Sequence, residues 1–293
     1  MSEIFRRFGR GPGTIIMGLV FIWLAGMVLA PNLTMIEYAL RPNLPPARIG
    51  GPDDVYTLAN ILYLFGEPIH RAIFLKTIWA SALVAFATFL VCYPLAYWLA
   101  QQASANQTAV ALVALTIPFW INEVLRTLAW YILLAFRGPL NAFLLATGII
   151  DTPIRWAGDG AVLVGMVYAY ILFMLFPIYN SIESLDKSQV EAARDLGASV
   201  WRIHWRVVLP HAKAGIATGC IFTFMLAAGS YVAPALLGSP GSRWFTEIIY
   251  NWFFEGGDWN RGAAYALVLL VLCLAVVFAV LKLARVNLAE VAK

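Results

Sequence analysis

The sequence predicts an all-α polytopic membrane protein with six transmembrane helices. Of its 293 residues, 61% are hydrophobic and 12% are charged, whereas soluble domains carry about 25% charged residues. The mean hydropathy is +0.77, and several apolar runs are long enough to cross about 30 Å of hydrocarbon as helices. No repeat or low-complexity segment divides the chain, so we expect a single transmembrane domain over residues 1–293.

The first span is expected at about residues 14–38, after a basic N-terminal segment. Its most apolar part, residues 14–30, is near the lower length limit for a spanning helix, and a cleaved signal peptide is the alternative. The one plausible small-residue cleavage site follows Ala30, and Pro31 comes directly after it. We therefore expect an uncleaved helix.

A polar, proline-containing segment at residues 41–71 follows the first span. Within it, Asp53 or Asp54 can cap a short helix whose apolar residues recur every three or four positions. These apolar residues are Val55, Leu58, Leu62 and Phe65. The pattern predicts a short helix that lies along the membrane surface.

The remaining five spans are predicted from apolar runs at residues 77–100, 108–136, 161–182, 214–237 and 263–284. The third of the six spans contains Pro118 and is long enough to tilt. The fifth contains Gly229 and Pro234 near its end, and these residues can break the helix there. Irregular backbone at membrane depth is tolerated where it lines a cavity or is buried in protein, so this break is a candidate wall or gate of a pathway.

Residues 183–211 form the one long charged segment between apolar runs. Ser188 and Glu191 have the spacing of a capping box at a helix start. The apolar face of this helix is expected to contain Val190, Ala193 and Leu196. Gly197 stands where the helix end needs a left-handed residue.

A second short helix is expected to carry Trp201, Trp205 and Val208 on one stripe, until Pro210 ends it or bends it into the fifth span. Two short helices around a glycine corner would form a rigid projection at the membrane surface. An amphipathic loop that lies among the lipid headgroups is the alternative.

The distribution of Lys and Arg predicts the orientation, because cytoplasmic loops carry an excess of these residues. Six crossings place both termini on one side. If that side is cytoplasmic, the inner segments contain Arg6, Arg7, Arg10, Lys187, Arg194, Arg202, Arg206, Lys213, Lys282, Arg285 and Lys293. The outer segments then contain Arg41, Arg48, Arg71, Lys76, Arg137, Arg155, Arg243 and Arg261. The bias predicts that both termini and residues 183–211 are cytoplasmic.

Nothing in the sequence indicates catalysis, metal binding or nucleic acid binding. It contains no GxxxxGK[ST] phosphate loop, no H-E-x-x-H and no G-x-S-x-G motif. The cysteines and histidines are Cys92, Cys220, Cys273, His70, His204 and His211. The cysteines lie in apolar runs, as small buried hydrophobes do, and the histidines lie at span ends or in loops. A net charge of +4 is too small and too dispersed for nucleic acid, so we expect a chain that is no enzyme and holds no cofactor or metal.

Glu123 and Arg126 are an ionisable pair inside the third span, three residues apart and therefore able to pair with each other. Charges in a span point to function by default, although these two could also neutralise each other or reach the interface. Aromatic residues occur in the spans at Tyr97, Trp120, Trp130, Tyr168, Tyr170, Tyr179 and Tyr231. They could hold ammonium groups by cation–π attraction or serve as interfacial belt and packing. The candidate pathway residues are Glu123, Arg126, Trp130, Tyr170, Ser230 and Tyr231.

The E-A-A run at residues 191–193, Gly197 and the V-x-L-P run at 207–210 resemble the EAA loop of ABC importer permeases. The family usually has Ile at the position of Val207. The resemblance implies the type I ABC importer permease fold and a loop that docks in a cleft of a cytoplasmic ATPase subunit. The coupling residues that it implies are Glu191, Ala192, Ala193, Gly197, Leu209 and Pro210. ATP and Mg would be bound by the partner ATPase dimer.

The P-F-W-I-N-E-V-L-R-T-L-A-W stretch and residues 55–100, 228–238 and 259–269 resemble permeases of spermidine/putrescine-type importers, especially the first of their two permeases. This resemblance implies a bacterial inner membrane protein that imports polyamines with a second permease, as a heterodimer, and a periplasmic binding protein. The chain has Ser230 where many such permeases have an acidic residue. Iron(III), phosphonates, opine-like compounds and a homodimer therefore stay open.

Two other classes of function remain as alternatives. A secondary transporter driven by an ion gradient often shows inverted repeats and broken helices near the midplane, but no repeat is visible here. A scaffold protein would use residues 183–211 to dock a soluble partner without transport. Uptake that survives ATP depletion would favour the former, and solute-independent partner binding the latter.

Overall fold

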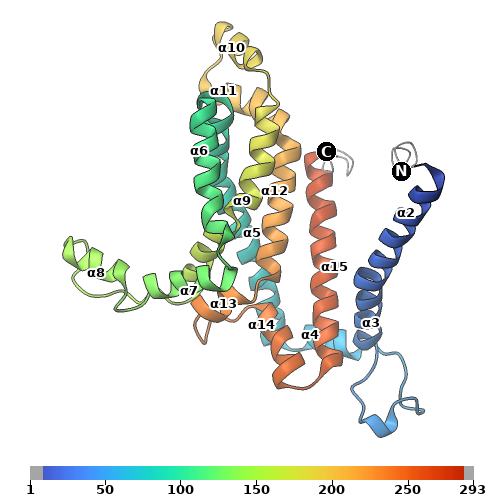
Figure 1. Cartoon of the computed structure of the whole chain (residues 1–293). Coiled ribbons are helices and arrows are strands. Elements are labelled where there is room, and N and C mark those ends of the chain that lie inside the picture. The colour runs from blue at the N-terminus through green and yellow to red at the C-terminus, as the bar shows by residue number, and fades with distance from the viewer. Residues whose placement is uncertain (1–8, 287–293) are drawn as a thin grey trace. The chain divides into compact units, whose positions relative to one another are not determined.

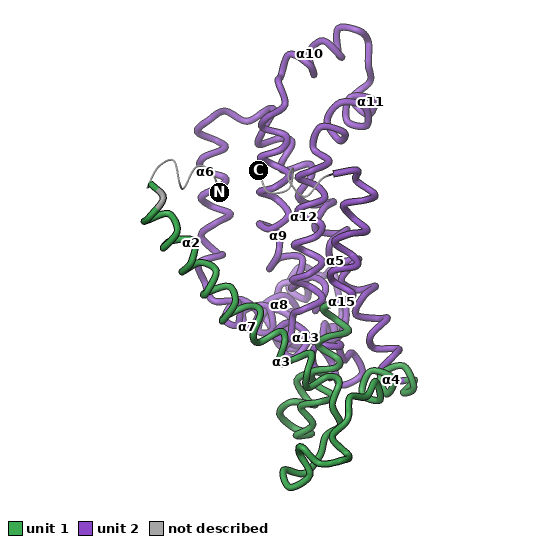
Figure 2. The backbone as a smooth tube through the Cα atoms, turned by 90° about the vertical axis from the view of Figure 1, so that its right-hand side faces the viewer, with its two compact units in different colours: residues 1–68, 249–270 green, residues 69–248, 271–293 purple. Residues whose placement is uncertain are grey.

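The computed structural model describes residues 9–286, and it is almost entirely helical, with no strand in that range (Figure 1). The chain forms two compact units, which are shown in different colours in Figure 2. One contains residues 1–68 and 249–270, and the other contains residues 69–248 and 271–293. Both units are assembled from two separate stretches of the chain, and the single-domain expectation stays a prediction.

The first unit begins with one long helix, which consists of α2 (Arg10–Leu24), a π turn η1 (Ala25–Leu29) and α3 (Ala30–Ala39). Its candidate span, Gly11–Ala39, matches the predicted first span. The π turn ends at Leu29, and the N–H of Ala30, the residue directly before Pro31, donates to the Ala25 carbonyl. Proline lacks an N–H and clashes with the carbonyl four residues earlier, and a widened turn is a recognised way to accommodate this.

The first unit also contains η2 (Pro46–Arg48), α4 (Ala59–Gly66), η6 (Asn251–Glu255) and the start of α15 (Trp259–Ala284). A short helix after the first span was predicted, but the residues predicted to cap it were the wrong ones. The Thr57 hydroxyl, not Asp53 or Asp54, accepts the first N–H at Ala59 (3.1 Å). The Asp54 carboxylate instead binds the Arg41 guanidinium (2.8 Å) and the Gly50 N–H (2.9 Å).

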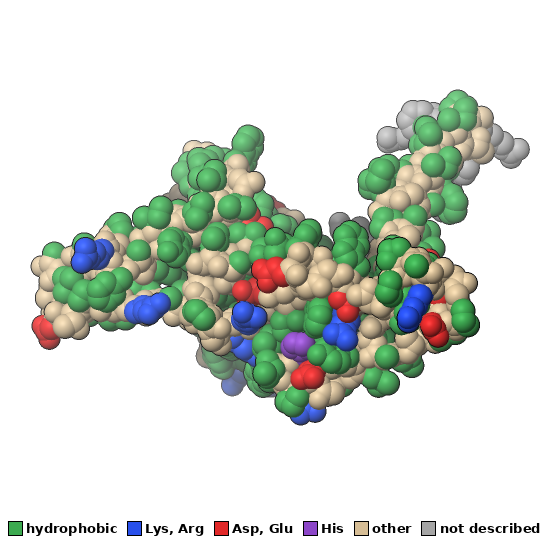
Figure 3. Space-filling model, turned by 90° about the horizontal axis from the view of Figure 1, so that it is seen from below, with side chains coloured by type: hydrophobic (Ala, Val, Ile, Leu, Met, Phe, Trp, Pro, Cys, Tyr) green, Lys and Arg blue, Asp and Glu red, His purple; other side chains and the backbone are tan. Residues whose placement is uncertain are grey.

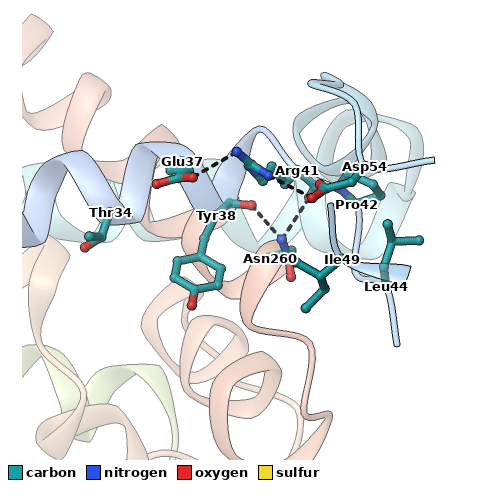
Figure 4. A pocket seen from close by; sticks show the side chains of 9 residues that line it. All are labelled: Thr34, Glu37, Tyr38, Arg41, Pro42, Leu44, Ile49, Asp54 and Asn260. Carbon is teal, nitrogen blue, oxygen red and sulfur yellow. Dashed lines mark hydrogen bonds and ion pairs between the residues drawn. The ribbon is translucent and has the colours of Figure 1, made fainter. Parts of the chain in front are cut away.

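These Asp54 contacts belong to a polar cluster at the C-terminal end of α3 (Figure 4). Arg41 also pairs with Glu37 (3.0 Å). Asn260 of α15 donates to the carbonyls of Tyr38 and Arg41, both at 2.9 Å. The last carbonyls of a helix need such partners because they have none within the helix. The cluster therefore ends α3 and holds the segment that follows it.

The second unit contains most of the spans. It includes α5 (Pro68–Tyr97), η3 (Trp98–Gln102), α6 (Ala105–Thr116), η4 (Ile117–Trp120), α7 (Glu123–Leu133), α8 (Pro139–Ala146), α9 (Asp159–Glu183), α10 (Lys187–Asp195), α11 (Val200–Ile203), η5 (His204–Val208), α12 (Leu209–Gly229), α13 (Val232–Leu237) and α14 (Phe245–Tyr250). The predicted spans at 77–100, 161–182 and 263–284 lie within α5–η3, α9 and α15.

The predicted third span at residues 108–136 is not one straight helix but a bent pair of helices. The chain bends by 93° between residues 105–120 and 123–133. Pro118 cannot donate a helix hydrogen bond, and the Asn122 side chain accepts the Val124 N–H (2.8 Å) and so caps a new helix, α7. In the described residues, five helices are long and apolar enough to span a membrane, and the bent pair makes a sixth if it is one span.

Helices α9 and α12 approach each other closely at two glycines. A Cβ atom at Gly215 would lie 2.1 Å from the Pro177 carbonyl oxygen, and one at Gly219 would lie 2.7 Å from Met174 Sδ. Small residues allow this kind of close helix packing within membranes. The pair forms the centre of the second unit, and Cys92, Ala96 and Tyr97 of α5 belong to the same buried cluster.

We expect Gly215→Ala to destabilise the protein by at least about 1–3 kcal/mol, the usual cost of overpacking a close contact. Gly229→Ala on the same helix is the matched control, because a Cβ atom added at Gly229 would meet no neighbouring side chain or helix within 4 Å. Thermal unfolding in detergent should show a lower midpoint for Gly215→Ala alone. Equal midpoints for the two variants would contradict the packing that we describe.

Candidate functional site: the segment between α9 and α12

The charged segment at residues 183–211 is attached to the bundle through buried apolar side chains. Leu185, Val190, Ile203 and Val208 are each at most 5% exposed. They belong to one cluster with residues of α5 and α9, such as Ala96 and Ile178. The segment is therefore packed as part of the second unit, as the expectation of a rigid projection requires.

Helix α10 begins at a cap that the sequence pattern misplaced. Asp186, not Ser188, is the N-cap residue, and its carboxylate accepts the Ser188 N–H at 2.9 Å. This backbone hydrogen bond lowers the pKa of the Asp186 carboxyl. The S-x-x-E pattern was ambiguous because Asp186 is an equally good cap residue two positions earlier.

Helix α10 ends at Asp195, and Gly197 supplies the predicted left-handed turn directly after its C-cap, Leu196. The backbone there has φ +74°, in the left-handed region. The Gly197 N–H donates to the Arg194 carbonyl (2.8 Å) and the Ala198 N–H to the Ala193 carbonyl (3.0 Å). These two bonds define a Schellman motif, for which glycine is the favoured residue.

The outward face of α10 carries the predicted coupling residues. Glu191 and Ala192 are exposed, and Ala193 is half-buried. The Glu191 carboxylate makes no hydrogen bond or ion pair with the described part of the chain, so it is available to a partner. The expectation that Leu196 shares the buried face of Val190 was wrong, because Leu196 is 88% exposed; it follows the last helical residue and points away from the bundle.

The second short helix does not end at Pro210. The chain runs helically from Val200, with Ser199 as N-cap, through the π turn η5 and on into α12. The Leu209 N–H reaches the His204 carbonyl in this widened turn, directly before Pro210, as Ala30 does before Pro31. Leu209 is half-buried and Pro210 exposed.

The extra residue in the π turn also rotates the side chains, so the predicted stripe was wrong. Val208 is fully buried, whereas Trp201 and Trp205 are 73% and 57% exposed. The two tryptophan rings pack edge to face, with their centroids 5.9 Å apart.

Polar contacts that the sequence did not predict also hold this segment. Gln101 of η3 and Tyr93 of α5 tie it to the spans, and Ser184 and His211 join its two ends. The Gln101 side-chain amide donates to the carbonyls of Ile182 (3.0 Å) and Leu185 (3.1 Å). The Tyr93 hydroxyl lies 2.7 Å from His204 Nδ1, and the Ser184 hydroxyl lies 3.0 Å from His211 Nε2.

The candidate pathway residues gather where two spans are interrupted. The bend before α7 and the break at residues 230–231 are brought together, because α7, α9 and α13 contact one another. The Tyr170 hydroxyl donates to Glu123 Oε1 over 3.5 Å. Ser230 Oγ is buried beside them without a hydrogen-bond partner of good geometry in the described residues. The predicted break at Gly229–Ser230 is confirmed by the extended backbone of Ser230.

Glu123 and Arg126 do not form the ion pair that their spacing allows. The Arg126 guanidinium lies over the Phe119 ring, 4.7 Å from its centroid, whereas Glu123 turns to Tyr170. The 93° bend brings Phe119 within reach of Arg126 in α7, which a straight helix would not do. Trp130 packs edge to face on Tyr168, with ring centroids 5.5 Å apart, and Tyr231 is 37% exposed.

The family model described as "Binding-protein-dependent transport system inner membrane component" matches residues 4–285. The chain therefore belongs to this family of inner membrane transport components.

Within residues 9–286, no group of three or more His, Cys, Asp or Glu side chains could hold a metal ion.

Curated relatives and solved structures specify the class further. The chain is 34% identical over 252 residues to the spermidine/putrescine transport system permease protein PotB of Escherichia coli K12, covering 85% of this chain and 89% of PotB. It is 32% identical over 229 residues to the inner membrane ABC transporter permease protein YdcU of the same organism, covering 74% and 72%.

A solved bacterial ABC transporter that imports the polysaccharide alginate has the same fold, with a TM-score of 0.76, 16% identity and 97% of both chains covered. The MetNI methionine ABC transporter matches with a TM-score of 0.55 and 17% identity, over 75% of this chain and 98% of that one. The fold is that of ABC importer permeases, and the chain is a permease of a binding-protein-dependent ABC importer in the inner membrane.

We expect Asp186→Ala to loosen the start of α10, because the capped N–H groups lose their acceptor. Tryptic cleavage at Lys187 and Arg194 should become faster. Ser188→Ala is the matched control and should leave cleavage unchanged. Faster cleavage in that variant would show that Ser188, not Asp186, is the cap residue.

The Asp186 cap has a defined pH dependence. A carboxyl whose pKa is lower in the folded state contributes stability above its ordinary pKa of about 3.9 and loses it as the pH falls through the lowered value. The difference in the free energy of unfolding between wild type and Asp186→Ala should therefore be constant between about pH 6 and pH 8.

Proposed function

We propose that this permease imports polyamines or a related small organic solute, driven by ATP hydrolysis in a separate ATPase dimer. The names of its curated relatives support the solute class. The exposed Glu191–Ala192 face on a firmly packed helix supports the coupling role, and it is the single observation that carries the mechanism.

The segment at residues 183–211 is the proposed ATPase-coupling element. Glu191, Ala192 and Ala193 present one charge and two small side chains, which permit close approach of a partner surface. Gly197 turns the chain back, and Leu209 and Pro210 continue into α12. Because Val190 and Ile203 are buried against α5 and α9, a displacement of α10 would move those spans with it.

Nucleotide would act as a ligand that favours one global state. A change from an inward-open to an outward-open pathway requires that ATP-bound ATPase binds one state better than the other. In this proposal both termini and α10 are cytoplasmic. A second permease, as a heterodimer, completes the pathway, and a periplasmic binding protein delivers the solute to the opposite side.

The proposed solute contacts lie at the paired interruptions. The Glu123 carboxylate and the Tyr170 ring are groups that attract ammonium. Many permeases of this type have an acidic residue where this chain has Ser230. In this chain Glu123 would supply the carboxylate instead, beside Tyr170. Arg126, Trp130 and Tyr231 complete the proposed pathway.

The docking surface for a binding protein would carry charges of both signs. On the face shown in Figure 3, acidic and basic side chains are intermixed among apolar ones. Such a surface fits a partner with a mixed pattern of charges better than a strongly acidic or basic partner. It does not indicate the charge of the solute.

A cysteine at Ala192 should crosslink to the ATPase subunit in the assembled importer, because this side chain points away from the bundle. Thr147→Cys, at the exposed residue directly after α8, is the control and should give no crosslink. The native cysteines Cys92 and Cys273 are buried and Cys220 is half-buried, so labelling stays selective. A crosslink at residue 147 but not at residue 192 would refute the proposed docking.

Glu123→Gln should reduce spermidine uptake by about tenfold or more, because a charge-assisted contact to an ammonium group is worth about 1.5–3 kcal/mol. Radiolabelled spermidine uptake into cells with the complete importer measures this. Glu255→Gln, which changes an exposed carboxylate, is the control. Unchanged uptake in Glu123→Gln at normal expression would exclude Glu123 from the pathway.

A further inference from the structure

A large groove in the second unit is lined in part by the proposed coupling segment, but by none of the proposed solute-pathway residues. Its volume is about 1250 Å³, and it is bounded by α5, by α11–η5–α12 and by the last turns of α15. This exceeds the roughly 300–1,000 Å³ typical of pockets for small molecules.

The floor of the groove is apolar. Phe86 and Leu90 of α5, Ile216 of α12 and Val280 of α15 line it. Phe86 and Leu90 are 58% and 56% exposed, so the groove exposes hydrocarbon side chains along spans that cross the bilayer. An occupant must therefore offer long apolar groups.

The end of the groove nearest α10 is polar and basic. Arg194, Lys213 and Gln102 line it, and no described lining residue is an aspartate or glutamate. Lys213 Nζ also lies 3.4 Å from the Arg285 carbonyl, at the end of α15. Trp201 and Trp205 line the same end, and exposed tryptophans are typical of the headgroup level of a membrane.

We propose that this groove is a binding site for an anionic phospholipid, with its headgroup at Arg194 and Lys213 and its acyl chains along Phe86, Leu90 and Ile216. The arrangement matches the two ends of the ligand, because basic residues beside an apolar cleft between spans bind anionic headgroups. A transmembrane helix in the groove would bury both cations without a counter-charge, which is costly. The site is independent of the proposed solute.

The test is retention of lipid by the purified, full-length permease. After delipidation and exchange into vesicles of phosphatidylcholine with one-tenth phosphatidylglycerol, native mass spectrometry counts the lipids that stay bound. Wild type should retain phosphatidylglycerol with at least about tenfold enrichment over phosphatidylcholine. The double variant Arg194→Gln/Lys213→Gln should lose most of this enrichment, because each basic residue contributes to headgroup attraction.

Arg202→Gln/Arg206→Gln is the matched control, because it removes two charges from the same region at positions that do not line the groove. It should keep the enrichment. Leu90→Trp should lower retention of both lipids by filling the groove. Equal loss in the two double variants, no enrichment in wild type, or a photocrosslinker at Leu90 that captures a protein helix instead of lipid would each overturn the proposal.

Discussion

The burial of Leu185, Val190, Ile203 and Val208 against α5 and α9 is the interaction on which the rest of the account depends. These side chains make the exposed α10 part of the bundle, although its own surface is polar. Burying such side chains stabilises the contact by about 1.5–3 kcal/mol each, and the Gln101 and Tyr93 hydrogen bonds add direction. A segment attached in this way can transmit a displacement, whereas a loose headgroup loop could not.

The same bundle has its polar interior where two spans are interrupted. Charges within a membrane are expensive and mark functional positions, and irregular backbone persists at that depth only where it is buried or lines a cavity. Glu123 is the charged group there, Ser230 has the irregular backbone, and Tyr170 of α9 donates to Glu123. The coupling segment and this polar cluster are joined by α9, which packs against the first at Ile178 and contributes Tyr170 to the second.

Much of this arrangement follows from sequence. Apolar runs located the spans, and Gly197 located a left-handed helix end, because few other residues adopt that backbone without strain. The misses have physical causes. Ser188 and Asp186 are both good caps, the Pro118–Asn122 segment hides a 93° bend inside one apolar run, and a π turn before Pro210 rotates Val208 away from Trp201. Contacts between distant residues, such as Tyr93 with His204, leave no local pattern.

Amide hydrogen exchange of the isolated permease tests the central claim most directly, since it asks whether residues 187–208 are fixed without any partner. We predict protection of the α10 and η5 amides that approaches that of α9, because these helices share one buried cluster. Exchange of residues 187–208 as fast as that of the irregular segment at residues 49–57 would contradict the account, because a segment that opens freely cannot carry force from an ATPase into the spans.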